Sequence, residues 1–265
     1  MINEDHRTNA STRKNRPEHG SCLRNTRARL VFPVTTGVIF VSLFVLAVFW
    51  SFKAEKKRDQ LFMAMSAKND FESISNDEAL NILAVSESKI LNEGMNHRVK
   101  RAMIKRGDSF SLLICEVRYQ TRTGKNNNSQ DETICAVMHN EPLPHFSVRA
   151  VNPLDKFMRD SKANKGFLAN LVVSITPEYD KNQIDFTDDV HFNEKFVVVS
   201  DNTNETTEFL DFDKRKYFVE NFIDTLVNRI DFTKNMLALR CNGYIDLKKL
   251  PELASKAINI FKSFL

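Results

Sequence analysis

The side chains best suited to chemistry lie just beyond the middle of the chain, in a cluster of acidic and imidazole groups. They are Asp185, Asp188, Asp189 and His191. Carboxylates and imidazoles bind divalent metals, and a carboxylate near a histidine can act in acid and base catalysis. Asp185 and Asp189 also flank a predicted turn, where aspartates usually cap backbone amides in water. Both interpretations stay open, and Asp185, Asp189 and His191 are the candidate catalytic residues.

Two cysteines, Cys115 and Cys135, lie on the two arms of a predicted hairpin. If its loop is centred on Lys125, they face one another, because each is ten residues from that centre. They could form a disulfide in an oxidising compartment, or they could be two small apolar side chains on a buried face. We favour the second interpretation, because paired strands seldom offer disulfide geometry. Cys241 also leaves this region with an odd number of cysteines.

Other chemical motifs have little support. The sequence has no Cys-x-x-Cys, no Gly-x-Ser-x-Gly and no His-Glu-x-x-His, which gives no support to structural zinc, a nucleophile elbow or a zinc protease. Gly124-Lys125 lacks the rest of a phosphate-binding loop, because Tyr119 and Asn126 stand at the positions of its first glycine and its hydroxyl residue. We therefore assign no metal ligand and no cofactor.

An uncharged apolar stretch runs from Leu30 to Phe52 and determines where in the cell these residues lie. As a helix it is roughly 34 Å long, which matches a hydrocarbon core of about 30 Å. A signal peptide has a shorter apolar centre and a small-residue cleavage site, whereas this stretch ends in Trp50 and Phe52. A helix buried in a soluble core is rarely apolar on every side. We predict a single transmembrane helix over 30–52, with the lipid bilayer as its partner.

The charge is concentrated before this helix. Residues 1–29 contain seven Lys or Arg and three acidic residues, so this segment carries the +4 charge of the whole chain. Its composition predicts a disordered arm, and its basic residues favour a cytoplasmic N-terminus with the large domain on the opposite side. Lys53, Lys56, Lys57 and Arg58 weaken that bias. The remainder is nearly neutral, which argues against nucleic-acid binding by the large domain.

After the membrane helix the pattern predicts a helical linker region over 53–94, with Ser75 and Glu78 as a capping box. An α+β domain follows over 95–265, with possible subdomains 95–151 and 152–265. Its clearest element is the hairpin of 110–121 and 131–139 around a polar loop. A helix is predicted over 213–227, a strand over 236–241 and an amphipathic helix from Pro251 to the end. Irregular mixing of helices and antiparallel strands indicates the α+β class.

Short motifs in this domain occur in a distinctive order: EVRYQTRTGKNNNSQDETICAV, LPHFSVR, IDF, HFNEKFVV and ALRCNGYIDLKKLPELASKAINIF. In that order they resemble a family of uncharacterised bacterial proteins, many of them membrane-associated, over residues 95–265. The family has Asp where this chain has Glu116, and Arg-Pro-Glu where it has Arg149-Ala150-Val151. The resemblance implies a shared fold unit and no activity.

Two functions from different classes follow from the sequence. In the first, a single-pass membrane protein of bacteria carries a binding or assembly domain whose partner is another protein. In the second, the domain is a membrane-tethered hydrolase or metal-dependent enzyme that uses the cluster from Asp185 to His191. A concave site that contains Asp185, Asp189 and His191 together would favour the enzyme.

Overall fold

The computed structural model describes residues 28–86, 95–123, 126–153, 155–156, 182–222 and 226–265. The chain divides into two compact units, 1–56 and 57–265. The predicted arm 1–29, apart from residues 28 and 29, lies outside the described residues.

The first unit contains the apolar stretch. Helix α1 spans Ala28–Lys68 and includes all of the predicted segment 30–52. Among the described residues it is the one helix long and apolar enough to cross a membrane, and its most apolar window has no buried residues. Large apolar side chains such as Phe44 and Phe52 are about 70% exposed, which fits a helix surrounded by lipid.

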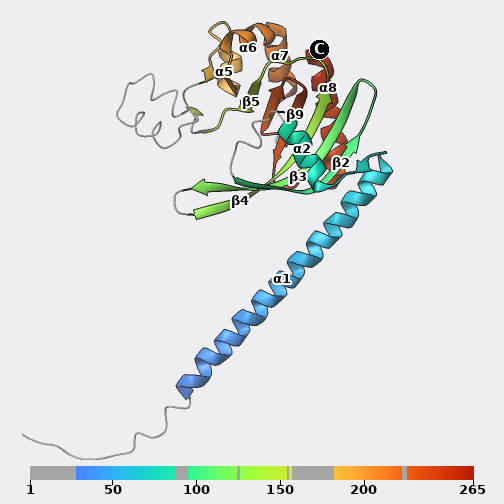
Figure 1. Cartoon of the computed structure of the whole chain (residues 1–265). Coiled ribbons are helices and arrows are strands. Elements are labelled where there is room, and N and C mark those ends of the chain that lie inside the picture. The colour runs from blue at the N-terminus through green and yellow to red at the C-terminus, as the bar shows by residue number, and fades with distance from the viewer. Residues whose placement is uncertain (1–27, 87–94, 124–125, 154, 157–181, 223–225) are drawn as a thin grey trace, which may run out of the picture. The chain divides into compact units, whose positions relative to one another are not determined.

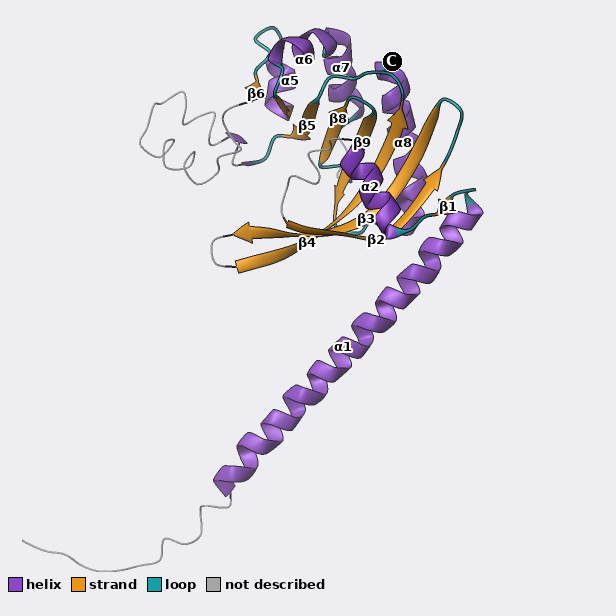
Figure 2. Ribbon diagram, in the orientation of Figure 1, coloured by secondary structure: helices purple, strands orange, loops and turns teal. Residues whose placement is uncertain are grey.

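The second unit is an α+β fold, as predicted. Its single antiparallel sheet has nine strands in the order β1-β2-β3-β4-β9-β8-β5-β7-β6 (Figure 2). The strands are β1 Glu72–Ser73, β2 Met95–Lys105, β3 Phe110–Thr123, β4 Asn126–His139, β5 Phe146–Ala150, β6 Gln183–Ile184, β7 Phe196–Ser200, β8 Arg229–Thr233 and β9 Met236–Asn242. The helices are the end of α1, α2 Asn76–Val85, α5 Val190–Lys195, α6 Thr203–Phe209, α7 Phe212–Asn221, the 3-10 turn Leu247–Lys249 and α8 Leu250–Phe264.

Helices pack on both faces of the sheet. Helix α2 and helix α8 cover opposite faces (Figure 1). On the α8 face the core is rich in phenylalanine: Phe146 stacks on Phe232 with ring centres 4.3 Å apart, and Phe218 contacts Phe264. On the α2 face a smaller core joins Ala79 and Leu83 to the strands. Both faces of the central strands are therefore buried.

The sheet crosses the possible boundary between residues 151 and 152. Strand β4 pairs with β9, and β5 pairs with both β7 and β8. A division at that position would therefore cut a continuous sheet. The expected linker region 53–94 also contributes to the second unit, because Phe62, Ile74 and Leu83 are buried in its cores.

The hairpin is present, but its register differs from the prediction by one residue. The last pair is Thr123 with Asn126, so the paired positions are centred between residues 124 and 125 and not on Lys125. Cys115 therefore lies opposite Ile134, and Cys135 lies opposite Ile114. A shift of one residue moves a side chain to the other face of the sheet, so the two cysteines lie in different cores.

Several elements were not predicted. Strand β8 and the short helices α5 and α6 have no clear periodicity in the sequence. The predicted helix 213–227 ends at Asn221, where the Phe222 amide still donates to the Phe218 carbonyl at 2.9 Å. The predicted N-cap at Ser75 is confirmed, since its hydroxyl accepts from the Glu78 amide at 3.1 Å. The Glu78 carboxylate accepts a hydrogen bond from Arg106.

Candidate binding site

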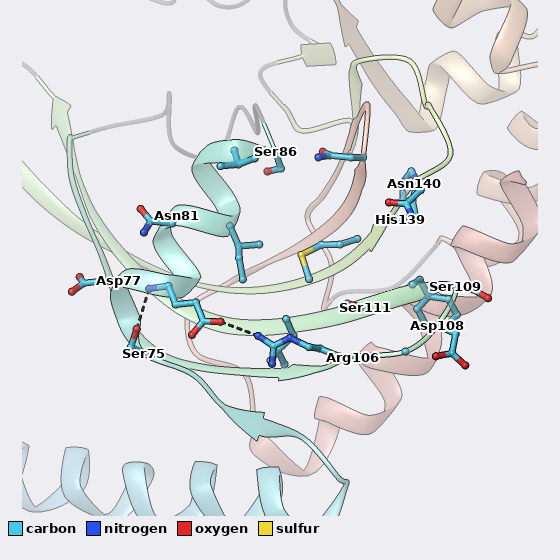
Figure 3. A pocket seen from close by; sticks show the side chains of 18 residues that line it. Ser75, Asp77, Asn81, Ser86, Arg106, Asp108, Ser109, Ser111, His139 and Asn140 are labelled. Atoms are coloured by element: carbon cyan, nitrogen blue, oxygen red, sulfur yellow. Dashed lines mark hydrogen bonds and ion pairs between the residues drawn. The ribbon is translucent and has the colours of Figure 1, made fainter.

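An open concavity lies on the α2 side of the sheet. This α2 pocket, of about 850 Å³, is lined by one side of α2, the β2–β3 turn, the end of β4 and Asn235. Figure 3 shows Asn81 and Ser86 on α2 across from His139 and Asn140. Its size is in the range of sites that bind small ligands or short peptide segments.

Helix α2 has one face for the core and another for the pocket. Ala79 and Leu83 are fully buried against the sheet. Asn81 and Val85 line the pocket, and Val85 is 75% exposed. Residues three or four positions apart share a face of a helix. Ala79 and Leu83 therefore lie on the face of α2 that packs on the sheet, and Asn81 and Val85 lie on the face that lines the pocket.

The β2–β3 turn forms the opposite wall. A Cβ atom on Gly107 would lie 2.8 Å from the Phe110 carbonyl oxygen, so the close approach of the backbone requires glycine there. This tight turn places Arg106, Asp108 and Ser109 at the rim, with Ile104 and Met138 at the apolar floor.

The rim carries more negative than positive charge. Arg106 donates to Glu72 and to Glu78, the latter at 2.9 Å (Figure 3). Its guanidinium is therefore already paired with two carboxylates. Asp77 and Asp108 add two exposed negative charges, so the pocket is suited to a partner group with positive charge.

His139 adds a buried imidazole to the lining. Its ring centre is 4.8 Å from that of Phe261 on α8, and the residue is 5% exposed. Burial lowers the pKa of the imidazole below its usual value. Burial therefore disfavours a positive charge on His139 that would offset the acidic rim.

The candidate catalytic residues lie elsewhere, on and before α5. Asp185 and His191 are exposed. Asp189 accepts from the Phe192 amide as the N-cap of α5, and Arg215 binds both Asp188 and Asp189. None of the residues Asp185, Asp189 and His191 lines the α2 pocket. Two of the acidic side chains in this cluster therefore have evident structural partners.

No trio of His, Cys, Asp or Glu in the described residues has the arrangement of a metal site. Cys115, Cys135 and Cys241 are free and buried. Burial raises the pKa of the Cys115 and Cys135 thiols far above the ordinary value, which makes them poor nucleophiles.

Sequence reasoning missed two buried charge clusters. On the α8 face, Glu116 accepts from Arg58 at the end of α1 and from Arg101 on β2. On the other face, Arg240 donates two hydrogen bonds to Glu132, at 2.9 and 3.0 Å, and the Tyr119 hydroxyl donates to the same carboxylate. For Glu116 a signal was available, because it interrupts an otherwise apolar stretch of β3. Glu132 lies between Asp131 and Thr133 in a polar run, which gave no such signal.

Arg58 and Asp59 attach the C-terminal part of α1 to the sheet through specific contacts. Arg58 donates to the Ile245 carbonyl at 2.8 Å and stacks over Tyr244. Asp59 accepts from Arg101. Together with buried Phe62, these contacts show that the last turns of α1 belong to the folded domain.

Comparisons with known proteins show a partial similarity to a solved structure. No protein-family model matches the chain, and no curated protein matches it. Among solved structures, the chain resembles the mycobacterial trehalose monomycolate transport factor A, TtfA, with a TM-score of 0.49 and 10% sequence identity. The match covers 78% of this chain and 93% of that chain. A similarity of this size supports no inference about function, and the motif resemblance to bacterial membrane-associated proteins stays a resemblance.

Proposed function

We propose that this chain is a single-pass membrane protein whose α+β domain binds another protein close to the membrane surface. The observation that carries the proposal is the α2 pocket, an open concavity of about 850 Å³ with an apolar floor and an acidic rim. The partner inserts a segment with a Lys or Arg side chain beside an apolar one. The bilayer holds the chain through residues 30–52.

The short connection supports a role at the membrane. The folded domain begins at Lys57, five residues after Phe52, the last residue of the apolar stretch. Even a fully extended chain over five residues reaches only about 18 Å. The domain is therefore confined to a thin layer beside the membrane. This confinement raises its effective concentration toward partners in the same membrane. Modest affinity at the α2 pocket is then sufficient.

Site-specific photo-cross-linking tests the proposal. A photoreactive phenylalanine analogue replaces Asn81, which is exposed at the pocket wall. A second protein carries the same analogue at Lys216, an exposed residue of α7 outside the pocket. In native membranes we expect a discrete protein adduct from position 81 only. Equal adducts from both positions, or none from position 81, would contradict the proposal.

The charge requirement has its own test. Asp77→Asn combined with Asp108→Asn removes both exposed rim carboxylates. We expect the adduct from position 81 to fall several-fold, because a buried or partly buried charge pair with the partner is lost. Asp213→Asn is the matched control, because Asp213 is also an exposed acidic residue in the first turn of a helix. An equal fall in the control would show that the pocket charge has no specific role.

A further inference from the structure

A second concavity lies on the α8 side of the sheet, across the β2–β3 turn from the α2 pocket. This α8 groove has a volume of about 510 Å³. Its walls are mostly apolar. They include Phe71 after α1, Phe110 and Leu112 on β3, and Pro251, Ala254 and Ile258 on α8.

The groove continues inward toward the core. A small gap of about 30 Å³ shares Asn69, Phe71, Pro251 and Ala254 with the groove. Beyond them this gap is lined by Met65, Met103, Ile114 and Leu250. Flexible methionine side chains adapt readily to apolar ligands. The inner end of the groove is therefore suited to the end of a hydrocarbon chain.

The outer end carries two cations. Lys105 and Arg106 line the groove and are each about half exposed. The Lys105 ammonium lies 3.8 Å from a carboxylate oxygen of the exposed Asp70, and Arg106 contacts Glu72 and Glu78. Arg106 stays with its two carboxylates. The Lys105–Asp70 pair is exposed, and exposed ion pairs contribute little to stability, so an anionic group can replace Asp70 at Lys105. Asp108 is the acidic residue that also lines this end.

We propose that the α8 groove holds one acyl chain of an anionic membrane phospholipid, with the phosphate bound by Lys105. Three observations support this occupant: the apolar walls that lead to the core, the loosely paired lysine at the mouth, and a domain that begins five residues after the apolar stretch. The two concavities share the turn residues from Arg106 to Phe110. Lys105 and Ser255 line the groove and not the α2 pocket, so variants at these two positions distinguish the lipid from a protein partner at the α2 pocket.

The test uses the full chain in nanodiscs with photoreactive phosphatidylglycerol that carries a diazirine in its acyl chain. After illumination, adducts are mapped by mass spectrometry. We expect adducts within 250–258 in addition to those on the apolar stretch. A matched phosphatidylcholine probe should give several-fold fewer adducts in the domain, because its head group has no net charge. Adducts confined to residues 30–52 would overturn the proposal.

Two tryptophan variants on the same helix provide the control. Ser255→Trp fills the groove from an exposed position on α8. Ser263→Trp adds the same side chain at an exposed position outside the groove. We expect Ser255→Trp to reduce domain adducts at least fivefold and Ser263→Trp to leave them unchanged. Equal yields from the two variants would overturn the proposal.

A third variant covers the case in which Ser255→Trp unfolds the domain. Lys105→Gln changes only an exposed side chain and should reduce the preference for phosphatidylglycerol over phosphatidylcholine. An unchanged preference would overturn the role of Lys105. For each of these variants, the yield of protein adduct from a photoreactive residue at position 81 is measured separately and reports on the α2 pocket.

Discussion

Glu116 on β3 connects its strand to helix α1 and to strand β2. It is 1% exposed and accepts hydrogen bonds from Arg58 on α1 and Arg101 on β2. Arg101 itself is 7% exposed and also contacts Asp59. A buried carboxylate between two arginines offsets the cost of burying all three charges only while the set is complete.

Glu116→Ala should therefore strongly destabilise the domain. Loss of one partner of a buried ion pair typically costs about 3 to 5 kcal/mol, because the remaining charge is buried without compensation. The measurement is urea unfolding of the full chain in detergent. Glu220→Ala is the control, since Glu220 forms only an exposed pair with Lys216 and should cost less than about 0.5 kcal/mol. Similar losses in both variants would refute this role of Glu116.

The stability of the domain should depend on pH through Asp131. Two hydrogen bonds from Arg118, at 2.6 and 2.8 Å, hold the pKa of this carboxyl below its usual value. Because the unfolded chain binds the proton more tightly, this contribution to stability is complete above about pH 4 and is lost as the pH falls through the lower native pKa. Asp131→Asn should be less stable than the unchanged protein at pH 6, and the gap should close below pH 4. A gap independent of pH would contradict the assignment.

At the scale of elements, α5 depends on the residues that first suggested a catalytic cluster. Asp189 caps the helix at the Phe192 amide, 3.0 Å away, and also contacts Arg215. Arg215 is 3% exposed in its side chain and lies over the Phe186 ring. These contacts connect α5 to α7 and to the phenylalanine core.

Asp189→Ala should lower stability by about 1 to 3 kcal/mol, since it removes a helix cap and one partner of a buried arginine. His191→Ala should change it by less than about 0.5 kcal/mol, because His191 is exposed. Thermal unfolding of both variants measures this contrast. If Asp189→Ala were as stable as the unchanged protein, the structural role of Asp189 would be refuted, and a catalytic role would have to be considered again.

Elements with a strong local sequence pattern were predicted correctly from the sequence more often than contacts between residues far apart in the chain. The hairpin, the cap at Ser75, strand β9 and the C-terminal helix follow from alternation, capping and helical spacing that each segment contains by itself. The register of β3 and β4 was missed by one residue because it depends on where the turn is centred. Strand β8 and the α2 pocket could not be predicted, because they depend on neighbours far away in the sequence.

At the scale of the whole molecule, the described anchor is one apolar helix and the folded domain begins almost directly after it. The basic residues before the helix favour a cytoplasmic N-terminus, which places the domain on the opposite side. This orientation is a prediction from charge alone. It determines which proteins can reach the α2 pocket.

A single cysteine at Asn127, in a variant without the native cysteines, tests the orientation. Asn127 lies on β4 beside the end of the hairpin. With the predicted orientation, a maleimide that cannot cross membranes should label it in intact cells, because the domain then lies outside the cytoplasm. Labelling that appears only after lysis would reverse the orientation. A cysteine introduced at Asn9, in the basic arm, should show the opposite behaviour.

The most direct test of a binding domain that acts at the membrane is to lengthen its connection to the anchor. A flexible insert of 60 Gly and Ser residues between Phe52 and Lys57 lets the domain move roughly 40 Å from its attachment point. The same insert after Leu265 is the control. With the photoreactive residue at position 81, we expect the first insert to reduce the protein adduct several-fold and the second to leave it unchanged. An undiminished adduct with the long connection would contradict the account.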